Sequence, residues 1–354
     1  MKYILRGLFL CVILIIFSCS MNKKTDKPEM TYTFQKENAV EFVDSMLPIS
    51  KEIVLDTTIV APLTNYTNIQ LDRNRIFCYD LSYVYEYDKD GHFICKIGEV
   101  GHGKGEYIQA HGVTLNKQDE VVEVLDNQEI YRYNYNGRFI SKEQIDAPFS
   151  NFVYNDGYYW FSSDNNDACG DYTLYKYDNT YNRVDWICER KTDFCVGGSD
   201  FGKGTIITYH NVFSHDIYQI VGNKAVFAYT LKFPGLEIPK SFYKADITTI
   251  TNEMKNNNFA LIRTFIENEQ YIFMLVHEYK SGNMESAYYW IIDKTQKEER
   301  IVKLDTSNDD VYYLNPQVLD KDNNLYFVGC KDNPNIGIYG VDLKLLFSKI
   351  NKKQ

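Results

Sequence analysis

Tyr85-Glu86-Tyr87-Asp88 is the first copy of the pattern that decides the fold: an aromatic residue, two further residues, then an acid or amide. The later copies are Tyr131-Arg132-Tyr133-Asn134, Tyr175-Lys176-Tyr177-Asp178, the degenerate Tyr218-Gln219-Ile220-Val221, Trp290-Ile291-Ile292-Asp293 and Tyr339-Gly340-Val341-Asp342. The intervals between copies are 46, 44, 43, 72 and 49 residues. Four of these intervals match the roughly 40–50 residues that one four-stranded propeller blade occupies.

A second strand-like run precedes each copy. The six runs are Ile76 to Tyr79, Val121 to Val124, Tyr158 to Phe161, Ile206 to Tyr209, Tyr271 to Met274 and Leu325 to Val328. Asp90-Gly91 and Asn136-Gly137 follow the first two copies, and such pairs favour tight hairpin turns. The repeat therefore predicts an all-β fold, a six-bladed β-propeller. An open sandwich is the main rival, but it does not require this period.

The long interval of 72 residues predicts an insertion between blades four and five. Residues 234–258 account for its excess, and Phe242, Ile250 and Met254 form an approximate helical stripe within it. We interpret the segment as a short helical insertion, and an irregular loop is the alternative. At the N-terminal end, Ile53 to Ile59 is a strand-like run ahead of the first repeat, and we expect it to join the last blade and close the ring. Residues 345–347 could form an outer strand or a terminal helix.

The first residues have the anatomy of a bacterial export signal. Lys2 and Arg6 precede the apolar run from Leu8 to Phe17, which is short for a membrane span but typical of a signal peptide. The run ends in Ile16-Phe17-Ser18-Cys19, which resembles a lipobox. We therefore expect a lipoprotein signal peptide at 1–18, acylation of Cys19, a lipid-anchored tether at 19–48 and the propeller at 49–354. The alternative is a plain secretory signal.

The net charge excludes some classes of binding partner, and the positions of two cysteines predict that they are free thiols. The net charge of −10 disfavours binding of nucleic acid, whose phosphates need a basic face. The expected membrane contact is the acylated Cys19 rather than electrostatic attraction to anionic lipid. Cys78 and Cys95 lie in apolar strand-like runs, so buried free thiols are expected there.

Two stretches carry a family resemblance. Residues 96–107, with glycines at 98, 101, 103 and 105, and the run from Phe213 to Ile220 are similar to segments of the six-bladed β-propeller lipoproteins of Bacteroidota. The first stretch also resembles the glycine-rich link between NHL repeats, although Lys104 stands where the family usually has proline. The resemblance implies a propeller fold and a location in the cell envelope. It supplies no catalytic residues.

The candidate ligand-binding residues lie in two unusual connections. Asp164, Asn165, Asp167 and Asp171 form a hydrogen-bonding set that suits sugar hydroxyls, and their oxygens could also hold a calcium ion. Phe242 and Tyr243 could provide a stacking face in the insertion. Both connections are equally explained as solvated loops or as a helix covering a blade edge. We predict no catalytic residue and no cofactor.

Two classes of function remain open. The first is a non-catalytic binding propeller in the envelope, expected to be anchored in the outer membrane, for an unknown glycan, peptide or protein. The second is a metal-dependent propeller hydrolase or lyase with a site in the central channel. Neither the HExxH motif nor the G-x-S-x-G elbow occurs in the sequence. Fold alone does not decide between the classes, so binding is preferred.

Overall fold

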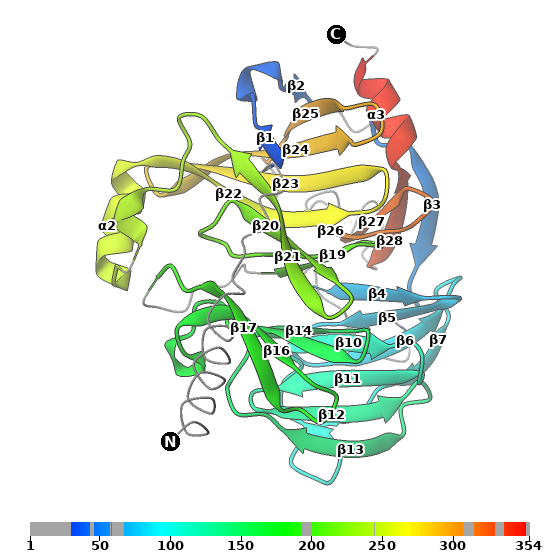
Figure 1. Ribbon diagram of the computed structural model, residues 1–354. Helices are drawn as coiled ribbons and strands as arrows, with labels where there is room; N and C mark the ends of the chain where they lie inside the picture. Colours follow the sequence, from blue (N-terminus) through cyan, green and yellow to red (C-terminus); the bar gives the residue numbers. More distant parts are fainter. Residues whose placement is uncertain are drawn as a thin grey trace, which may run out of the picture. The chain divides into compact units, whose positions relative to one another are not determined.

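The computed structural model describes residues 30–42, 46–56, 58, 67–192, 200–243, 245–306, 315–329 and 336–351. The expected signal peptide and Cys19 lie outside these residues. Residues 31–354 form one compact unit. Its sheets are those of a six-bladed β-propeller, which confirms the predicted fold class (Figure 1).

Each blade is built on four antiparallel strands, which follow one another from the channel outward. Blade 1 consists of β4 (Asn68–Asp72), β5 (Arg75–Tyr79), β6 (Val84–Asp88) and β7 (Phe93–Lys96). Blade 2 consists of β10 (Gly112–Asn116), β11 (Val121–Asp126), β12 (Glu129–Asn134) and β13 (Phe139–Gln144). Blade 3 consists of β14 (Asn151–Asn155), β15 (Tyr158–Ser162), β16 (Tyr172–Tyr177) and β17 (Arg183–Glu189).

The other three blades follow the same plan. Blade 4 consists of β18 (Asp200–Lys203), β19 (Ile207–His210), β20 (Asp216–Val221) and β21 (Lys224–Lys232). Blade 5 consists of β22 (Asn258–Glu267), β23 (Tyr271–Lys280), β24 (Asn283–Asp293) and β25 (Glu298–Leu304). Blade 6 consists of β26 (Pro316–Leu319), β27 (Asn324–Gly329), β28 (Gly337–Asp342) and β3 (Ile49–Val54).

The repeated tetrapeptide marks the third strand of every blade, and the run before it marks the second. Its aromatic residue is buried, as Tyr85, Tyr175 and Trp290 show. Its acid ends the strand and caps the following turn: the Asp88 carboxylate accepts the amides of residues 90 and 92, and the Asp178 carboxylate accepts those of residues 180 and 182. The pattern therefore combines a core aromatic with a turn cap, and the blade 4 copy, which ends in Val221, lacks the capping acid.

The chain's ends close the ring in blade 6. β3 pairs antiparallel with β28, with Ile53 opposite Ile338 and Val54 opposite Gly337. Ring closure by a segment preceding the first repeat is therefore confirmed, but the strand is Ile49–Val54 rather than residues 53–59. Ile59 lies outside the described residues. The strand starts directly after Pro48, and Ile53 is buried against the core of blades 6 and 1.

Residues 30–42 lie along the outer edges of two blades. β1 (Met30–Thr33) is the fifth strand of the blade 4 sheet, and β2 (Val40–Glu41) pairs in parallel with β25 of blade 5. Figure 1 shows β2 in blue beside β25 in orange. The 3-10 helix η1 (Lys36–Asn38) connects them. We call residues 30–42 the strap. They correct the expected tether boundary, because the packed body begins near residue 30 rather than at 49.

Two buried aromatic residues hold the strap. Phe34 is 2% exposed, and its ring centroid lies 5.4 Å from those of Phe233 and Trp290, so it fills the seam between blades 4 and 5. Phe42 is buried with Tyr289 in the core of blades 5 and 6. The strap could not be recognised as strand from its short, polar sequence, because its partners lie more than 190 residues away.

Helices occupy the connections and the C-terminal end of the described chain. α2 (Ile247–Asn256) lies in the chain between β21 and β22, and the Asp246 side chain caps its N-terminus by accepting the amide of residue 249. The 3-10 helix η4 (Lys240–Phe242) precedes it. Residues 345–347 lie in α3 (Leu343–Asn351), so they form a terminal helix rather than an outer strand. A further 3-10 helix, η3 (Asp167–Cys169), lies between β15 and β16.

The glycine-rich stretch connects blade 1 to blade 2, as predicted. It contains the short parallel pair β8 (Glu99–Val100) and β9 (Glu106–Tyr107). Gly105 has a φ of +78°, and a Cβ there would lie 2.6 Å from the Phe139 ring. The Glu106 carboxylate accepts the amide of Gly103. Glycine-rich loops can bind phosphate through their backbone amides, but the Gly103 amide already donates to the protein's own carboxylate.

The two cysteines expected as core thiols lie in blade 1. Cys78 is buried and Cys95 is half-buried, and both are free thiols. Burial raises the pKa of the Cys95 thiol to about 12. These thiols are therefore unreactive core groups rather than nucleophiles.

Candidate functional site

The connection between β15 and β16 does not gather its polar residues around one point. Asn165 is fully buried, and its side-chain oxygen accepts a hydrogen bond from Asn211 at 3.1 Å. Asp167 starts η3 and is exposed, while Asp171 lies 3.9 Å from Arg190 at the surface. Asp164 has a φ of +48° in the turn. Across the described residues, no three His, Cys, Asp or Glu side chains are placed to hold a metal ion.

The aromatic residues of the insertion divide between core and surface. Phe242 is 0% exposed, and its ring centroid lies 5.6 Å from that of Phe213 and 5.2 Å from that of Phe259. Its ring therefore packs inside the protein and cannot provide the expected stacking face. Tyr243 is 43% exposed, with the Lys191 ammonium 5.6 Å from its ring centroid.

Three histidines lie next to β22 within the packed blades. His210 and His215 each place Nε2 near a β22 carbonyl, those of Ile262 and Ala260 respectively. His277 lies on the next strand, opposite Leu261. Burial lowers the pKa of all three imidazoles, and it lowers the pKa of His215 and His277 to about 4. They are neutral side chains of the fold.

The protein is therefore expected to lose stability as the pH falls from about 6.5 toward 4. The unfolded chain binds protons on His215 and His277 throughout this range while the folded chain excludes them, at a cost on the order of 1–3 kcal/mol each. Urea unfolding at pH 7.5, 6 and 5 measures the loss. A variant with His215→Gln and His277→Gln should show a shallower fall, and an unchanged fall would contradict the assignment.

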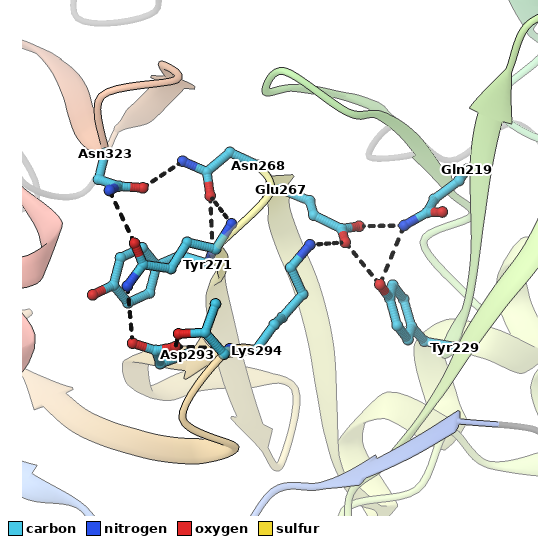
Figure 2. Close-up of polar contacts among 10 residues, drawn as sticks. Gln219, Tyr229, Glu267, Asn268, Tyr271, Asp293, Lys294 and Asn323 are labelled. Atoms are coloured by element: carbon cyan, nitrogen blue, oxygen red, sulfur yellow. Dashed lines mark hydrogen bonds and ion pairs between the residues drawn. The ribbon is translucent and has the colours of Figure 1, made fainter.

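A cluster of polar side chains around Glu267 lies where blades 4, 5 and 6 meet (Figure 2). The Glu267 carboxylate, fully buried at the end of β22, accepts hydrogen bonds from Lys294 at 2.7 Å, Tyr229 at 2.7 Å and Gln219 at 2.9 Å. Asn268 continues the cluster by donating to Asn323 of blade 6 at 2.8 Å. Both carboxylate oxygens of Glu267 are occupied by the protein's own donors, so this cluster joins blades rather than receiving a ligand.

A hydrogen bond from a tyrosine hydroxyl to a carboxylate also joins two other pairs of neighbouring blades. Tyr135 of blade 2 donates to Asp72 of blade 1 at 2.9 Å, and Tyr159 of blade 3 donates to Glu123 of blade 2 at 2.7 Å. Burial raises the pKa of Glu123. A tyrosine hydroxyl on a buried carboxylate is thus a repeated inter-blade contact, and it explains part of the sequence's high tyrosine content.

In the central channel, the side chain of Lys203 extends from one blade to the opposite blade. The first strands of the blades line the channel, and β18 of blade 4 contacts β14, β22 and β26. Lys203, at the end of β18, extends to blade 1 on the opposite side of the ring. Its ammonium donates to the Tyr79 hydroxyl at 3.0 Å and lies 3.5 Å from the Asn68 side-chain oxygen.

Lys203 borders two cavities. The smaller, of about 40 Å³, is also lined by Asn68, Asp200 and His210. The larger, of about 160 Å³, lies among the first strands of blades 1, 2, 3, 4 and 6 and is lined by residues including Gln70, Thr114, Lys117 and Tyr154. A concave space with a few polar groups among apolar walls is the usual form of a ligand site. We therefore take the larger cavity as the candidate site.

The sequence signal for this site is Gly202-Lys203-Gly204. A Cβ at Gly202 would lie 2.1 Å from the Phe265 carbonyl oxygen, and one at Gly204 would lie 1.8 Å from that of Glu267. The two glycines let β18 approach the backbone of β22. The tripeptide alone could not reveal that the lysine between them crosses the ring.

Residues 49–337 match the family model described as "Domain of unknown function (DUF4934)". The chain belongs to this family. The matched range runs from the closing strand β3 to the first residue of β28, and so includes blades 1 to 5 and part of blade 6. The sequence has no significant match among curated proteins.

Several solved structures are similar to this chain. A Bacteroides fragilis protein named "Putative exported protein" is similar over 88% of this chain and 98% of its own, with a TM-score of 0.66 and 16% identity. The WD40 domain of Pan2 from Neurospora crassa matches 77% of this chain and 74% of its own, with a TM-score of 0.46 and 8% identity. BamB from Moraxella catarrhalis matches 83% and 99%, with a TM-score of 0.40 and 9% identity.

The first of these structures shares the fold, and its name points to export. None of the helices in the described part of the chain has the length and apolar composition of a membrane span.

Proposed function

We propose that this protein is an envelope lipoprotein whose propeller binds a small ligand in the central channel without transforming it. The observation that carries the proposal is the 160 Å³ cavity among the first strands of five blades. The polar cluster around Glu267 supports the same choice indirectly, because its carboxylate is already occupied by protein donors. The export signal in the sequence and the name of the B. fragilis protein support the envelope location.

A variant that fills the cavity tests the proposal. Val318 is half-buried and lines the cavity, so Val318→Phe places a larger side chain there. Val184→Phe, on the exposed edge of blade 3, is the matched control. Purified mature protein is screened by thermal shift against saccharides, amino acids, short peptides and organic acids. A ligand that stabilises the wild type and the control but not Val318→Phe supports the proposal.

Two results would contradict it. A ligand that stabilises Val318→Phe as well as the wild type binds outside the channel, and the exposed Asp167, Asp171 and Tyr243 are then the next positions to substitute. Conversion of the bound ligand, together with stoichiometric zinc or calcium in the purified protein, would instead favour the metal-dependent hydrolase or lyase. Mass spectrometry of the ligand and metal analysis give both readouts.

Cys19→Ala is expected to move the protein from the detergent phase to the aqueous phase or to leave the signal peptide uncleaved. The thioether and amide positions that carry the acyl chains require the cysteine, and anchoring of this kind takes more than one acyl chain. Phase partitioning of cell extracts and the mass of the N-terminal peptide measure the change. Cys78→Ala, at a buried position in blade 1, is the control. Unchanged partitioning of Cys19→Ala would overturn the lipid anchor.

A further inference from the structure

We propose that the 160 Å³ channel cavity binds a small organic carboxylate with an apolar body, its anionic group held by Lys203 and Lys117. This inference rests on the proposed function, since it assigns the class of ligand to the same cavity. Three features of the lining carry it: its charge, the partners of its two lysines and its size.

The lining is cationic in a chain whose net charge is −10. Among the described residues that line the cavity, Lys117 and Lys203 are the charged side chains, and neither Asp nor Glu is present. A cavity with one sign of charge and apolar walls concentrates ions of the opposite sign. The charged groups on the lining are thus opposite in sign to the net charge of the whole protein, which favours an anion over a cation or a neutral sugar.

Both lysines have neutral partners. The Lys203 ammonium contacts the Tyr79 hydroxyl and the Asn68 amide oxygen, and its centre lies 5.1 Å from the Tyr79 ring centroid. Lys117 donates to the backbone carbonyl of Leu71 at 2.9 Å. These contacts orient the ammonium groups without neutralising them.

Two aspartates close to these lysines accept hydrogen bonds from neutral side chains and keep their charge. Asp72, beside Lys117, accepts from Tyr135, and Asp200, on the strand of Lys203, accepts from Asn151 at 2.8 Å. Within the described residues neither forms an ion pair with Lys117 or Lys203. A ligand carboxylate can therefore supply the charge-assisted hydrogen bonds that the protein does not.

Size and wall chemistry define the rest of the ligand. An apolar cavity of about 150 Å³ accommodates benzene, so a cavity of 160 Å³ suits a body of about six carbon atoms. Most of the wall is apolar, with Val113, Phe152 and Ile207 among its residues. Among the described residues, the lining contains no arginine, the residue whose planar fork best matches phosphate. A carboxylate on an apolar skeleton fits better than phosphate or a polar sugar acid.

Isothermal titration with matched probes tests the assignment. Benzoate and hexanoate are compared with benzamide and hexanamide, which keep the body but lack the charge, and with inorganic phosphate. We expect the wild type to bind the carboxylates at least tenfold more tightly than the amides, and more weakly as salt increases. Lys203→Met, close in length but uncharged, should weaken carboxylate binding at least tenfold, and Lys117→Met severalfold.

Lys224→Met, at an exposed position of blade 4, should leave binding unchanged. Equal affinity for benzoate and benzamide, or an unchanged benzoate affinity in folded Lys203→Met, would overturn the inference. Preferential binding of phosphate would do so as well. If Lys203→Met fails to fold, the comparison of acid with amide in the wild type decides alone. Should Val318→Phe block a neutral ligand while no carboxylate binds, the proposed function stands and this inference fails.

Discussion

A chain that begins at residue 56 is expected to melt at least about 10 °C below the wild type and to self-associate. It lacks β3, so the five residue pairs with β28 are lost and the buried Ile53 and Leu55 are removed. Burial of one such aliphatic side chain contributes about 1.5–3 kcal/mol. The unpaired edge of β28 then becomes a template for a second chain. Calorimetry and light scattering measure the two effects.

A chain that begins at residue 49 is the matched control. It keeps β3 and the closed ring but lacks the strap, including Phe34 in the seam between blades 4 and 5. We expect a smaller loss of thermal stability and a monomer. Equal melting temperatures for the two truncated chains would contradict the role of β3, and would place the stabilising contribution of the N-terminal residues in the strap.

The blades could be predicted from sequence because their determinants are local and repeated. An aromatic such as Tyr85 and an acid such as Asp88, three residues apart, meet the needs of core and turn within one strand and its hairpin. The strap lacks such a signal. β1 reads Met-Thr-Tyr-Thr, and its place is decided by β21, almost 200 residues away.

The candidate site residues also differ in whether local or long-range contacts determine their place. Phe242 was expected at the surface because it lies in an insertion, yet Phe213 and Phe259 from neighbouring segments bury it. Lys203 carries no signal of its own in the sequence, because its contact with Tyr79 depends on the ring being closed. Sequence periodicity therefore predicts the environment of residues whose neighbours lie in the same hairpin. It does not predict the environment of residues whose neighbours come from other blades.

Glu267→Ala is expected to lower the free energy of unfolding by about 3–5 kcal/mol, the cost of removing one partner of a buried ion pair. The carboxylate receives Lys294, Tyr229 and Gln219 in a fully buried position between blades 4 and 5. Its removal leaves the Lys294 ammonium, 18% exposed, without its counter-ion. Denaturant unfolding measures the change. Glu298→Ala, which removes a surface pair with Arg300, should cost less than about 1 kcal/mol.

Pairing Glu267 and Lys294 in a double-mutant cycle separates the charge from the packing. Lys294→Met alone should destabilise the protein, because the carboxylate then loses its cation and keeps only the Tyr229 and Gln219 donors. Glu267→Gln with Lys294→Met removes both charges and keeps much of the volume. Relative to the sum of the losses in Glu267→Gln alone and Lys294→Met alone, this double variant should recover at least about 1 kcal/mol, as expected for residues in direct contact. Strict additivity would show that the two groups act independently, and would contradict a stabilising ion pair between them.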